Sequence, residues 1–300
     1  MSILVKLNGI EMSVKKACEK LEIKYSTVYQ RMKFKGITFE EAIKGLVELE
    51  EEKEEVQNKT KKVMILNDIH VPYQLDDLCN KIKSVYNGEV DEIIIGGDLI
   101  DCESLSSFGK KYRISLKKEI TETVELLENL KETFKPKKIH YVGGNHDKDR
   151  YERVVEKMQE KDLYCFLPES LIQEVSEFVE GVVPVDNWYG RFYNNLIVCH
   201  PKSFSNIPAR TSEQCAEYFV NRGIASNTDV IVLGHTHKYS QIVATRRSNL
   251  MVVENGCLCK PMDYADTGKL SYGEQVNCFT VIELEKDKPI DKNKIKTYFL

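Results

Sequence analysis

The chain has 300 residues, 42% of them hydrophobic, which is enough to bury the core of an ordinary globular protein of about two domains. Its 43 basic and 47 acidic residues give a net charge of −4, so the overall charge of the protein does not favour binding to polyanions, and any contact with nucleic acid must be local. No stretch approaches the ~18 apolar residues of a membrane span, and lysines interrupt the amino terminus where a signal peptide would be apolar, so we expect a cytoplasmic protein with no membrane partner.

The charges divide the sequence into three parts. Residues 1–45 carry nine Lys and Arg against five Glu, residues 46–60 carry two Lys against six Glu, and residues 61–300 carry 32 against 36. We expect a small basic module, a charged linker and a larger domain with these boundaries. The linker, LVELEEEKEEVQNKT, lacks the periodicity of core residues, although its Glu and Lys content also suits a solvated helix.

The amino-terminal module shows a helical pattern that is broken once. Apolar residues recur at helical spacing up to Leu21 and again after Lys24. Ser13 can cap the first of these helices, and Ser26 or Thr27 can cap the second. The pattern predicts two short helices joined by a tight turn, which is the helix-turn-helix arrangement.

The start of the second helix would expose polar and aromatic side chains to a DNA groove, with basic residues nearby to meet phosphates. The segment resembles the small helix-turn-helix modules of phage and mobile-element proteins, including its trailing KGITFEEAI, and this favours a phage-encoded protein. The alternative is a helical hairpin that packs on the larger domain or mediates self-association. The candidate DNA-binding residues are Tyr25, Ser26, Thr27, Tyr29, Gln30, Arg31 and Lys33.

Beyond residue 61, five apolar runs each end in residues of a type that binds metals. KVMIL is followed by NDIH, EIIIGG by Asp98, KIHYVGG by NHD, NLIVC by His200, and DVIVLG by HTH. Helix-like stretches lie between some of them, over 115–134 and 150–167. This alternation predicts an α/β protein with a layered sheet, in which functional groups gather just beyond the strand ends.

The spacing within these motifs also indicates a metal centre. Side chains two apart on an extended segment face the same way, so Asp68 with His70, and His235 with His237, can each turn a pair toward one point. Carboxylate, imidazole and amide ligands suit a borderline cation, for which we favour Mn²⁺, with Fe, Zn²⁺ and Ni²⁺ as alternatives. His140 is the one histidine outside the strand ends, and we expect it to pack in the core or behind the ligands.

Taken as a set, these motifs resemble the calcineurin-like metallophosphoesterase superfamily, whose pattern is D-x-H, GD-x-x-D, GNH-D/E, a lone His and GH-x-H. The resemblance spans residues 61–280 and implies a β-sandwich flanked by helices, with two divalent metal ions and phosphoesterase activity. Members often dimerise, so a homodimer is one expectation. The implied ligands of the first metal are Asp68, His70, Asp98 and His237, and those of the second are Asp98, Asn145, His200 and His235.

The same resemblance leaves His146 outside the metal shell, where it would face the substrate. It would bond a phosphoryl oxygen or protonate the departing alkoxide, with Asp147 fixing its tautomer. Two cations roughly 3.5–4 Å apart would clamp the phosphate, and the hydroxide that they share would attack in line. We expect Asp101 to support His70 or the loop backbone.

Departures from the superfamily's subgroups narrow the substrate. Protein phosphatases continue the second motif as GD-x-V-D-R-G, whereas this chain reads GDLIDCE, and the missing Arg counts against a protein phosphatase. Candidate contacts to a second phosphate or to a nucleic-acid backbone are Arg113, with Lys110 and Lys111 beside it, and Arg150 after the GNHD motif.

We therefore favour a two-metal phosphodiesterase or nuclease acting on nucleic acid, with DNA ahead of RNA. One alternative is a phosphomonoesterase or nucleotide phosphatase whose amino-terminal module serves assembly. Another is a DNA-binding regulator with an inactive catalytic domain, which the intact ligand set opposes.

Two remaining features complete the sequence. The nine cysteines are scattered, which indicates free thiols in a reducing compartment, and no second pair follows Cys257 and Cys259 at zinc-ribbon spacing. The carboxyl end, from residue 276 onward, reads as two more strands with EKDKPIDKN as the turn between them.

Overall fold

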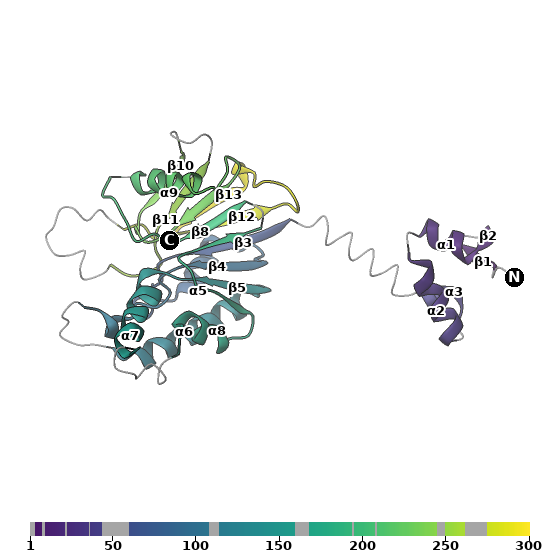
Figure 1. Ribbon diagram of the computed structural model, residues 1–300, viewed down its shortest axis with the longest axis horizontal. Helices are drawn as coiled ribbons and strands as arrows, with labels where there is room; N and C mark the ends of the chain where they lie inside the picture. The colour runs from purple at the N-terminus through teal and green to yellow at the C-terminus, as the bar shows by residue number, and fades with distance from the viewer. Residues whose placement is uncertain are drawn as a thin grey trace. The chain divides into compact units, whose positions relative to one another are not determined.

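The chain consists of two compact units, Met1–Lys59 and Thr60–Leu300 (Figure 1). All of the predicted linker except Thr60 lies outside the described residues, and so does Arg113. Within the described ranges, none of the helices combines the length and the apolar character that crossing a membrane requires. The computed structural model describes residues 4–7, 10–21, 23–35, 37–43, 60–107, 114–159, 168–193, 195–207, 209–244, 250–261 and 275–300.

The amino-terminal unit contains the two predicted helices, preceded by a hairpin that the sequence did not reveal. Ser13 ends the hairpin and caps the first helix, where its hydroxyl accepts the N–H of Lys16 at 3.4 Å. The second helix begins at Tyr25, so neither Ser26 nor Thr27 precedes it, and the prediction that one of them is its cap is wrong. The elements are β1 (Leu4–Leu7), β2 (Ile10–Ser13), α1 (Val14–Lys20), α2 (Tyr25–Lys35) and α3 (Phe39–Ile43).

This unit has its own small core. Ala17 from α1, Val28 from α2 and Ala42 from α3 are fully buried against one another's helices, and Phe39 is nearly so. The small side chains at these contacts allow the helices to approach closely. The periodicity that predicted the helices therefore also marks the residues that join them.

The carboxyl-terminal unit is a sandwich of two sheets flanked by helices, as the sequence predicted (Figure 1). The six-stranded sheet has the order β13 (Ile295–Phe299), β12 (Cys278–Leu284), β3 (Lys61–Leu66), β4 (Glu92–Gly96), β5 (Lys138–Val142) and β6 (Val182–Val185). The five-stranded sheet has the order β10 (Tyr239–Val243), β11 (Met251–Asn255), β9 (Val230–Leu233), β8 (Leu196–Cys199) and β7 (Tyr189–Phe192). β12 and β13 are the two predicted carboxyl-terminal strands, and they pair antiparallel.

The central strands, such as β4, β8 and β9, are buried on both faces because the other sheet covers one face and helices cover the other. Along β3, Val63 and Ile65 face the other sheet, whereas Met64 and Leu66 face the helices. This alternation is the period of two that an extended chain imposes. Each fully buried Val or Ile stabilises the fold by ~1.5–3 kcal/mol relative to an exposed side chain.

Helices close the outer faces of the sandwich. Leu126, Leu127 and Leu130 form the buried stripe of the longest helix, whose cap Ser115 accepts the N–H of Lys118 at 3.3 Å. Figure 1 shows α6, α7 and α8 on the side of the six-stranded sheet and α9 on the side of the other. These helices are α5 (Leu78–Val85), α6 (Leu116–Phe134), α7 (Arg150–Gln159), α8 (Leu171–Glu177) and α9 (Arg210–Asn221).

The strand directions bring the predicted ligands to one edge. β3, β4 and β5 run parallel in one sheet, and β8 and β9 run parallel in the other. In open α/β sheets, ligands bind outside the carboxyl ends of such strands. The segment after β5 forms a single π-type turn, η2 (Asn145–Asp149), which leads directly into α7. The residues that follow these five strands therefore meet in space.

Candidate metal centre

The predicted ligands lie on strained backbone at the strand ends. Five of the seven have a positive φ, which L-residues rarely adopt and which costs on the order of 1–3 kcal/mol each. Such strain persists only where the surrounding structure holds it, and it gathers at functional sites. The five are Asp68 (51°), His70 (52°), Asp98 (50°), His235 (78°) and His237 (55°).

Backbone bonds and a glycine hold these turns in place. The N–H of His235 donates to both carboxylate oxygens of Asp68, at 3.1 and 2.9 Å, and the N–H of His70 donates to the Asp98 carbonyl at 2.9 Å. A Cβ at Gly144 would lie 2.1 Å from Asp98 Oδ1, so only glycine allows the η2 segment to approach this carboxylate.

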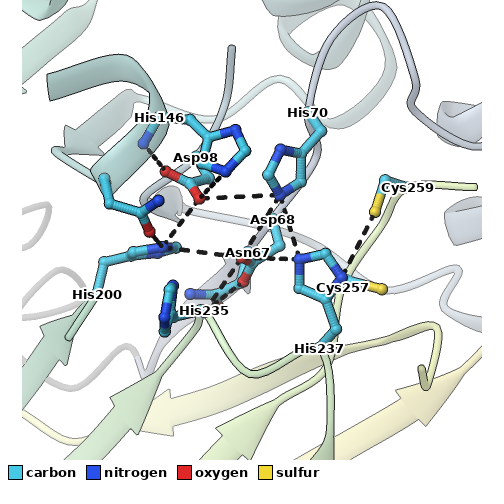
Figure 2. Close-up of polar contacts among 12 residues, drawn as sticks. Asn67, Asp68, His70, Asp98, His146, His200, His235, His237, Cys257 and Cys259 are labelled. Atoms are coloured by element: carbon cyan, nitrogen blue, oxygen red, sulfur yellow. Dashed lines mark hydrogen bonds and ion pairs between the residues drawn. The ribbon is translucent and has the colours of Figure 1, made fainter. Parts of the chain in front are cut away.

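In the first ligand group, His70 and His237 lie next to the carboxylates of Asp68 and Asp98 (Figure 2). His70 Nε2 lies 3.8 Å from Asp68 Oδ1 and 3.8 Å from Asp98 Oδ2. His237 Nε2 lies 3.3 Å from Asp68 Oδ1 and 3.2 Å from His70 Nε2. The four residues predicted for the first metal thus point toward one another.

The second ligand group shares Asp98 with the first. His200 Nε2 lies 3.1 Å from Asp98 Oδ2 and 3.2 Å from Asn145 Oδ1 (Figure 2). Asp98, His200 and His235 offer ligand atoms that all lie within 4.8 Å of one another. The carboxylate of Asp98 therefore belongs to both groups of candidate ligands.

The electrostatics of these residues fit a pair of divalent cations. Burial disfavours charged imidazoles, but the carboxylates outweigh it: Asp101 and Asp68 raise the pKa of His70 to about 10. Asp98 and Asp68 do the same for His200, whose pKa also rises to about 10. The Nε2 atoms of His70, His200 and His237 face the carboxylates. Metal ions entering here would replace these protons, so metal binding would release them.

The second nitrogen of three ligand histidines has a partner behind the centre. His70 Nδ1 lies 3.0 Å from Asp101 Oδ1, which is the contact expected for Asp101. His200 Nδ1 bonds the Gly96 carbonyl at 3.0 Å, and His237 Nδ1 lies 4.0 Å from the sulfur of Cys259. Such partners fix the ring orientation and leave Nε2 for the metal.

His146 lies beside the shared carboxylate, outside both ligand groups. Its Nε2 is 3.9 Å from Asp98 Oδ2, and its N–H donates to Asp98 Oδ1 at 2.8 Å. Its Nδ1 lies 2.9 Å from Asp101 Oδ1 and 3.0 Å from the Asp101 carbonyl. Burial lowers the pKa of His146 below 6.5, although the charge of Asp98 opposes this. The ring is therefore neutral near pH 7, with the Nδ1 proton held by Asp101.

The structure gives Asp147 a different role from the predicted one. Its carboxylate accepts the N–H of Leu99 at 2.9 Å, the hydroxyl of Tyr141 at 2.7 Å and the N–H of Gly144 at 2.6 Å. These bonds tie η2 to the loop after β4. Among the described residues, it is Asp101 and not Asp147 that bonds the His146 ring.

Arg150, which the sequence offered as a candidate substrate contact, lies beside His146 and Asp101. Its Nη2 is 2.9 Å from His146 Nε2, and its Nη1 donates to the Asp101 carbonyl at 2.8 Å. The guanidinium is thus placed next to the position where His146 would meet a phosphate. Its side chain is only 12% exposed.

A buried amide network under the ligands was not predicted. Asn255 Nδ2 donates to Asn67 Oδ1 at 2.7 Å and to the Ile65 carbonyl at 3.0 Å, and Asn67 Nδ2 donates to the Gly96 carbonyl at 2.9 Å. Thr280 Oγ1 donates to Asn255 Oδ1 at 2.6 Å. In the sequence, Asn67 stands at the end of an apolar run, and this position alone does not predict which residue it bonds.

His140 and the cysteine pair lie where packing explains them. His140 is half-buried, with Nε2 3.3 Å from Glu92 and its ring 5.1 Å from that of Phe192. Cys257 and Cys259 are fully buried free thiols. The Cys259 sulfur also lies 4.0 Å from Nδ1 of the candidate ligand His237.

The candidate DNA-binding residues of α2 show mixed exposure. Tyr25 is 40% exposed and lies 5.6 Å from the half-buried ring of Tyr29, over which Lys33 Nζ lies at 5.9 Å. Arg31 is half-buried and donates to the Ala42 carbonyl at 3.1 Å, so it serves the fold. Of the others, Ser26 and Gln30 are exposed, and the side chain of Thr27 is outside the described part.

The comparisons with known proteins agree with these motifs. A family model described as calcineurin-like phosphoesterase matches residues 61–239. No curated protein matches the chain. Among solved structures, the chain is similar to Vps29 of Chaetomium thermophilum, with 10% identity, a TM-score of 0.40, and coverage of 80% of this chain and 97% of that one. A second solved structure has 13% identity, a TM-score of 0.40, and coverage of 80% and 99%.

The family match covers more than half of the chain and contains every predicted ligand. The two residue groups that share Asp98 are clusters able to hold metal ions, as this chemistry requires. The chain therefore belongs to the calcineurin-like phosphoesterase family and is a metal-dependent phosphoesterase.

Proposed function

We propose that the carboxyl-terminal unit is a two-metal phosphodiesterase that cleaves nucleic acid, with DNA as the favoured substrate. The observation that carries this proposal is the convergence of two ligand groups, joined by Asp98, with His146 and Arg150 on one side of them. The residues that would hold the metals are Asp68, His70, Asp98 and His237 for the first and Asp98, Asn145, His200 and His235 for the second.

Two divalent cations would polarise the phosphoryl oxygens and lower the pKa of a water molecule that serves as nucleophile. The remaining step falls to His146. Its Nδ1–H is held by Asp101, so a proton gained at Nε2 can pass to the departing alkoxide while Asp101 stabilises the imidazolium. Burial is the main cause of the lowered pKa of His146, and the charge of Arg150 adds to it; when Arg150 turns to the phosphate, Nε2 is free to take up that proton from a water molecule.

The charge of the site supports a diester over a monoester. A diester phosphate carries one negative charge, whereas a monoester carries up to two and needs more cationic partners. At the position of the protein-phosphatase Arg this chain has Cys102, which is fully buried and cannot reach a phosphate. Arg150 is the guanidinium that the described residues place against His146.

The amino-terminal unit would provide DNA contact. The side chains of Tyr25, Gln30 and Lys33 reach solvent from one helix, as the recognition helix of a helix-turn-helix requires. In this proposal α2 holds DNA while the carboxyl-terminal unit cleaves it. A unit that instead mediates self-association would give a homodimer without affecting DNA affinity.

The first experiment compares the hydrolysis of bis(4-nitrophenyl) phosphate and 4-nitrophenyl phosphate by purified protein with added Mn²⁺, Fe²⁺, Zn²⁺ or Ni²⁺. The Asp98→Asn protein serves as the blank for contaminating activity. We expect preference for the diester, followed by cleavage of DNA and weaker cleavage of RNA. Preference for the monoester would refute the nuclease and favour a nucleotide phosphatase.

The contribution of the amino-terminal unit is tested by removing residues 1–45. Loss of this unit should slow the cleavage of DNA and leave hydrolysis of the small diester unchanged. If the rate on DNA is unchanged and sedimentation shows that the truncated protein has lost a dimer that the full chain forms, this unit would instead be assigned to assembly.

A further inference from the structure

The loop that follows the ligand His200 carries two large apolar side chains at the surface. Phe204 is 50% exposed and Ile207 is 57% exposed. Single exposed apolar residues are common, so this exposure has meaning only in its setting. Here the loop is continuous with a metal ligand and lies beside the second ligand group.

Phe204 borders the metal centre directly. Its ring centroid lies 6.1 Å from that of His235, with the two planes 72° apart. His235 in turn lies 5.3 Å from the ring of His200. If the second ligand group holds a phosphate, the Phe204 ring would therefore be near the substrate group that is attached to this phosphate.

The backbone under Phe204 is fixed from both sides. The Ser205 carbonyl accepts Lys238 Nζ at 3.1 Å, and the Ser205 N–H donates to Thr211 Oγ1 at 3.0 Å. The Ser205 hydroxyl also accepts the N–H of Ile207 at 3.1 Å. Because Lys238 follows the ligand His237 and Thr211 lies in α9, the ring position is tied to the centre, and binding a substrate need not order the loop.

A cation lies on the same loop. Lys202 Nζ is 2.9 Å from Asp149 Oδ2 at the end of η2, and the lysine side chain is 67% exposed. An exposed pair of this kind is weak, so Lys202 can be given up to a phosphate. The loop thus offers a cation and an aromatic face two residues apart, beside a phosphate-binding centre.

We propose that Phe204 forms a stacking subsite for the nucleobase attached next to the scissile phosphate. This inference rests on the proposed nucleic-acid function. Aromatic side chains accept every base because each base has a flat face, and single-stranded nucleic acid alternates such faces with phosphates. The subsite therefore selects single-stranded or locally unpaired nucleic acid, since a base within a duplex is already stacked on its neighbours.

The test compares a dinucleotide with its abasic analogue. Thymidylyl-thymidine and the same diester without either base are hydrolysed by the wild-type, Phe204→Ala and Phe204→Trp proteins. We expect Phe204→Ala to lower kcat/KM about tenfold on the dinucleotide and less than about twofold on the abasic diester. Phe204→Trp should restore the rate, because the larger ring also stacks.

Ile207→Ala is the matched control, since it removes an exposed apolar side chain from the same loop. It should leave both rates unchanged. Equal losses on both diesters in Phe204→Ala would show that the ring only supports the metal centre, and no loss on either would show that it does nothing; both results overturn the subsite.

Failure of the proposed function has a different signature. If the wild-type protein cleaves neither diester but hydrolyses monoesters, the comparison is repeated with thymidine 5′-phosphate and 2-deoxyribose 5-phosphate. A loss in Phe204→Ala that is confined to the nucleotide would keep the stacking subsite while the nuclease is refuted. Equal rates for the wild-type and variant proteins on the nucleotide would refute the subsite as well.

Discussion

Buried carboxylates in the metal centre and two buried carboxylates behind it, Asp147 and Glu119, have pKa shifts in opposite directions. Asp68 and Asp98 are fully buried in the centre, yet their pKa values are lowered, because the charge of His200 and the other imidazoles outweighs the cost of burial. Behind the centre, burial and the charge of Asp98 raise the pKa of Asp147 to about 6, and burial raises that of Glu119 to about 7.

The difference lies in what faces each carboxylate. Imidazole nitrogens face Asp68 and Asp98, whereas a hydroxyl and backbone amides face Asp147. Asp147 and Glu119 therefore take up protons readily, whereas Asp68, Asp98 and Asp101, which face imidazoles, keep their negative charge. Substitutions that are similar in chemistry should then have very different effects in the two regions.

The largest effect is expected from Asp98→Asn. This change removes the carboxylate shared by both ligand groups, and we expect activity to fall by at least about a thousandfold, with loss of bound metal. Metal content by mass spectrometry and hydrolysis of the small diester measure the two effects. Two equivalents of metal together with near-normal turnover would contradict the bridging role.

His146→Ala should reduce kcat by roughly 10²–10⁴, because it removes the group that moves the proton to the leaving alkoxide. Metal content should stay unchanged, since His146 lies outside both ligand groups. The loss should also shrink for a substrate with an acidic leaving group such as 4-nitrophenolate, which needs no protonation. Normal turnover on an alkyl leaving group would remove this assignment.

Asp101→Asn and Asp147→Asn form a matched pair that separates the two regions. Asp101 bonds both His70 and His146, so its change should cost about 10–100-fold in activity and alter the pH profile. Asp147 holds Leu99 and Gly144, so its change should mainly lower the free energy of unfolding, by about 1–3 kcal/mol. The reverse ranking in kinetics and urea denaturation would restore the role that the sequence suggested for Asp147.

The sequence revealed the ligands because they combine unusual residue types with strand ends. Asp68 and His70 were predicted as a pair from their spacing on an extended segment, but both have a positive φ, so turns after β3 bring them together. The carboxylate that bonds the His146 ring could not be predicted from the sequence, because both Asp101 and Asp147 are close to the metal-binding motifs. Only the path of the η2 turn, which directs Asp147 toward Tyr141, decides between them.

Contacts between residues that are far apart in the sequence could not be predicted either. Asn255 and Asn67 meet only when β11 and β3 come from different sheets to one edge, and neither has a neighbour that predicts the other. In the sequence Phe204 is an ordinary loop residue, and only the structure shows that its ring lies beside that of His235. Local periodicity predicts elements, whereas these contacts depend on how the elements pack.

Glu119→Gln should change the stability of the protein in a way that depends on pH. Glu119 is fully buried, and one of its oxygens accepts the N–H of Glu103 at 2.8 Å. Burial, with the charges of Asp101 and Glu103, raises its pKa from 4.5 to about 7, while the Glu103 amide and Arg150 oppose this. Between these values the folded state binds a proton that the unfolded state has lost. Stability therefore falls as pH rises through this window.

Glutamine removes this titration and keeps a neutral side chain of the same shape. Relative to the wild-type protein, the variant should gain stability between about pH 5 and pH 8, on the order of 2 kcal/mol in urea denaturation of metal-free protein. Asp147 titrates in both proteins, so its contribution cancels in the difference. A stability difference that is the same at both pH values would mean that Glu119 is ionised throughout, and that negative charge is not confined to the metal centre.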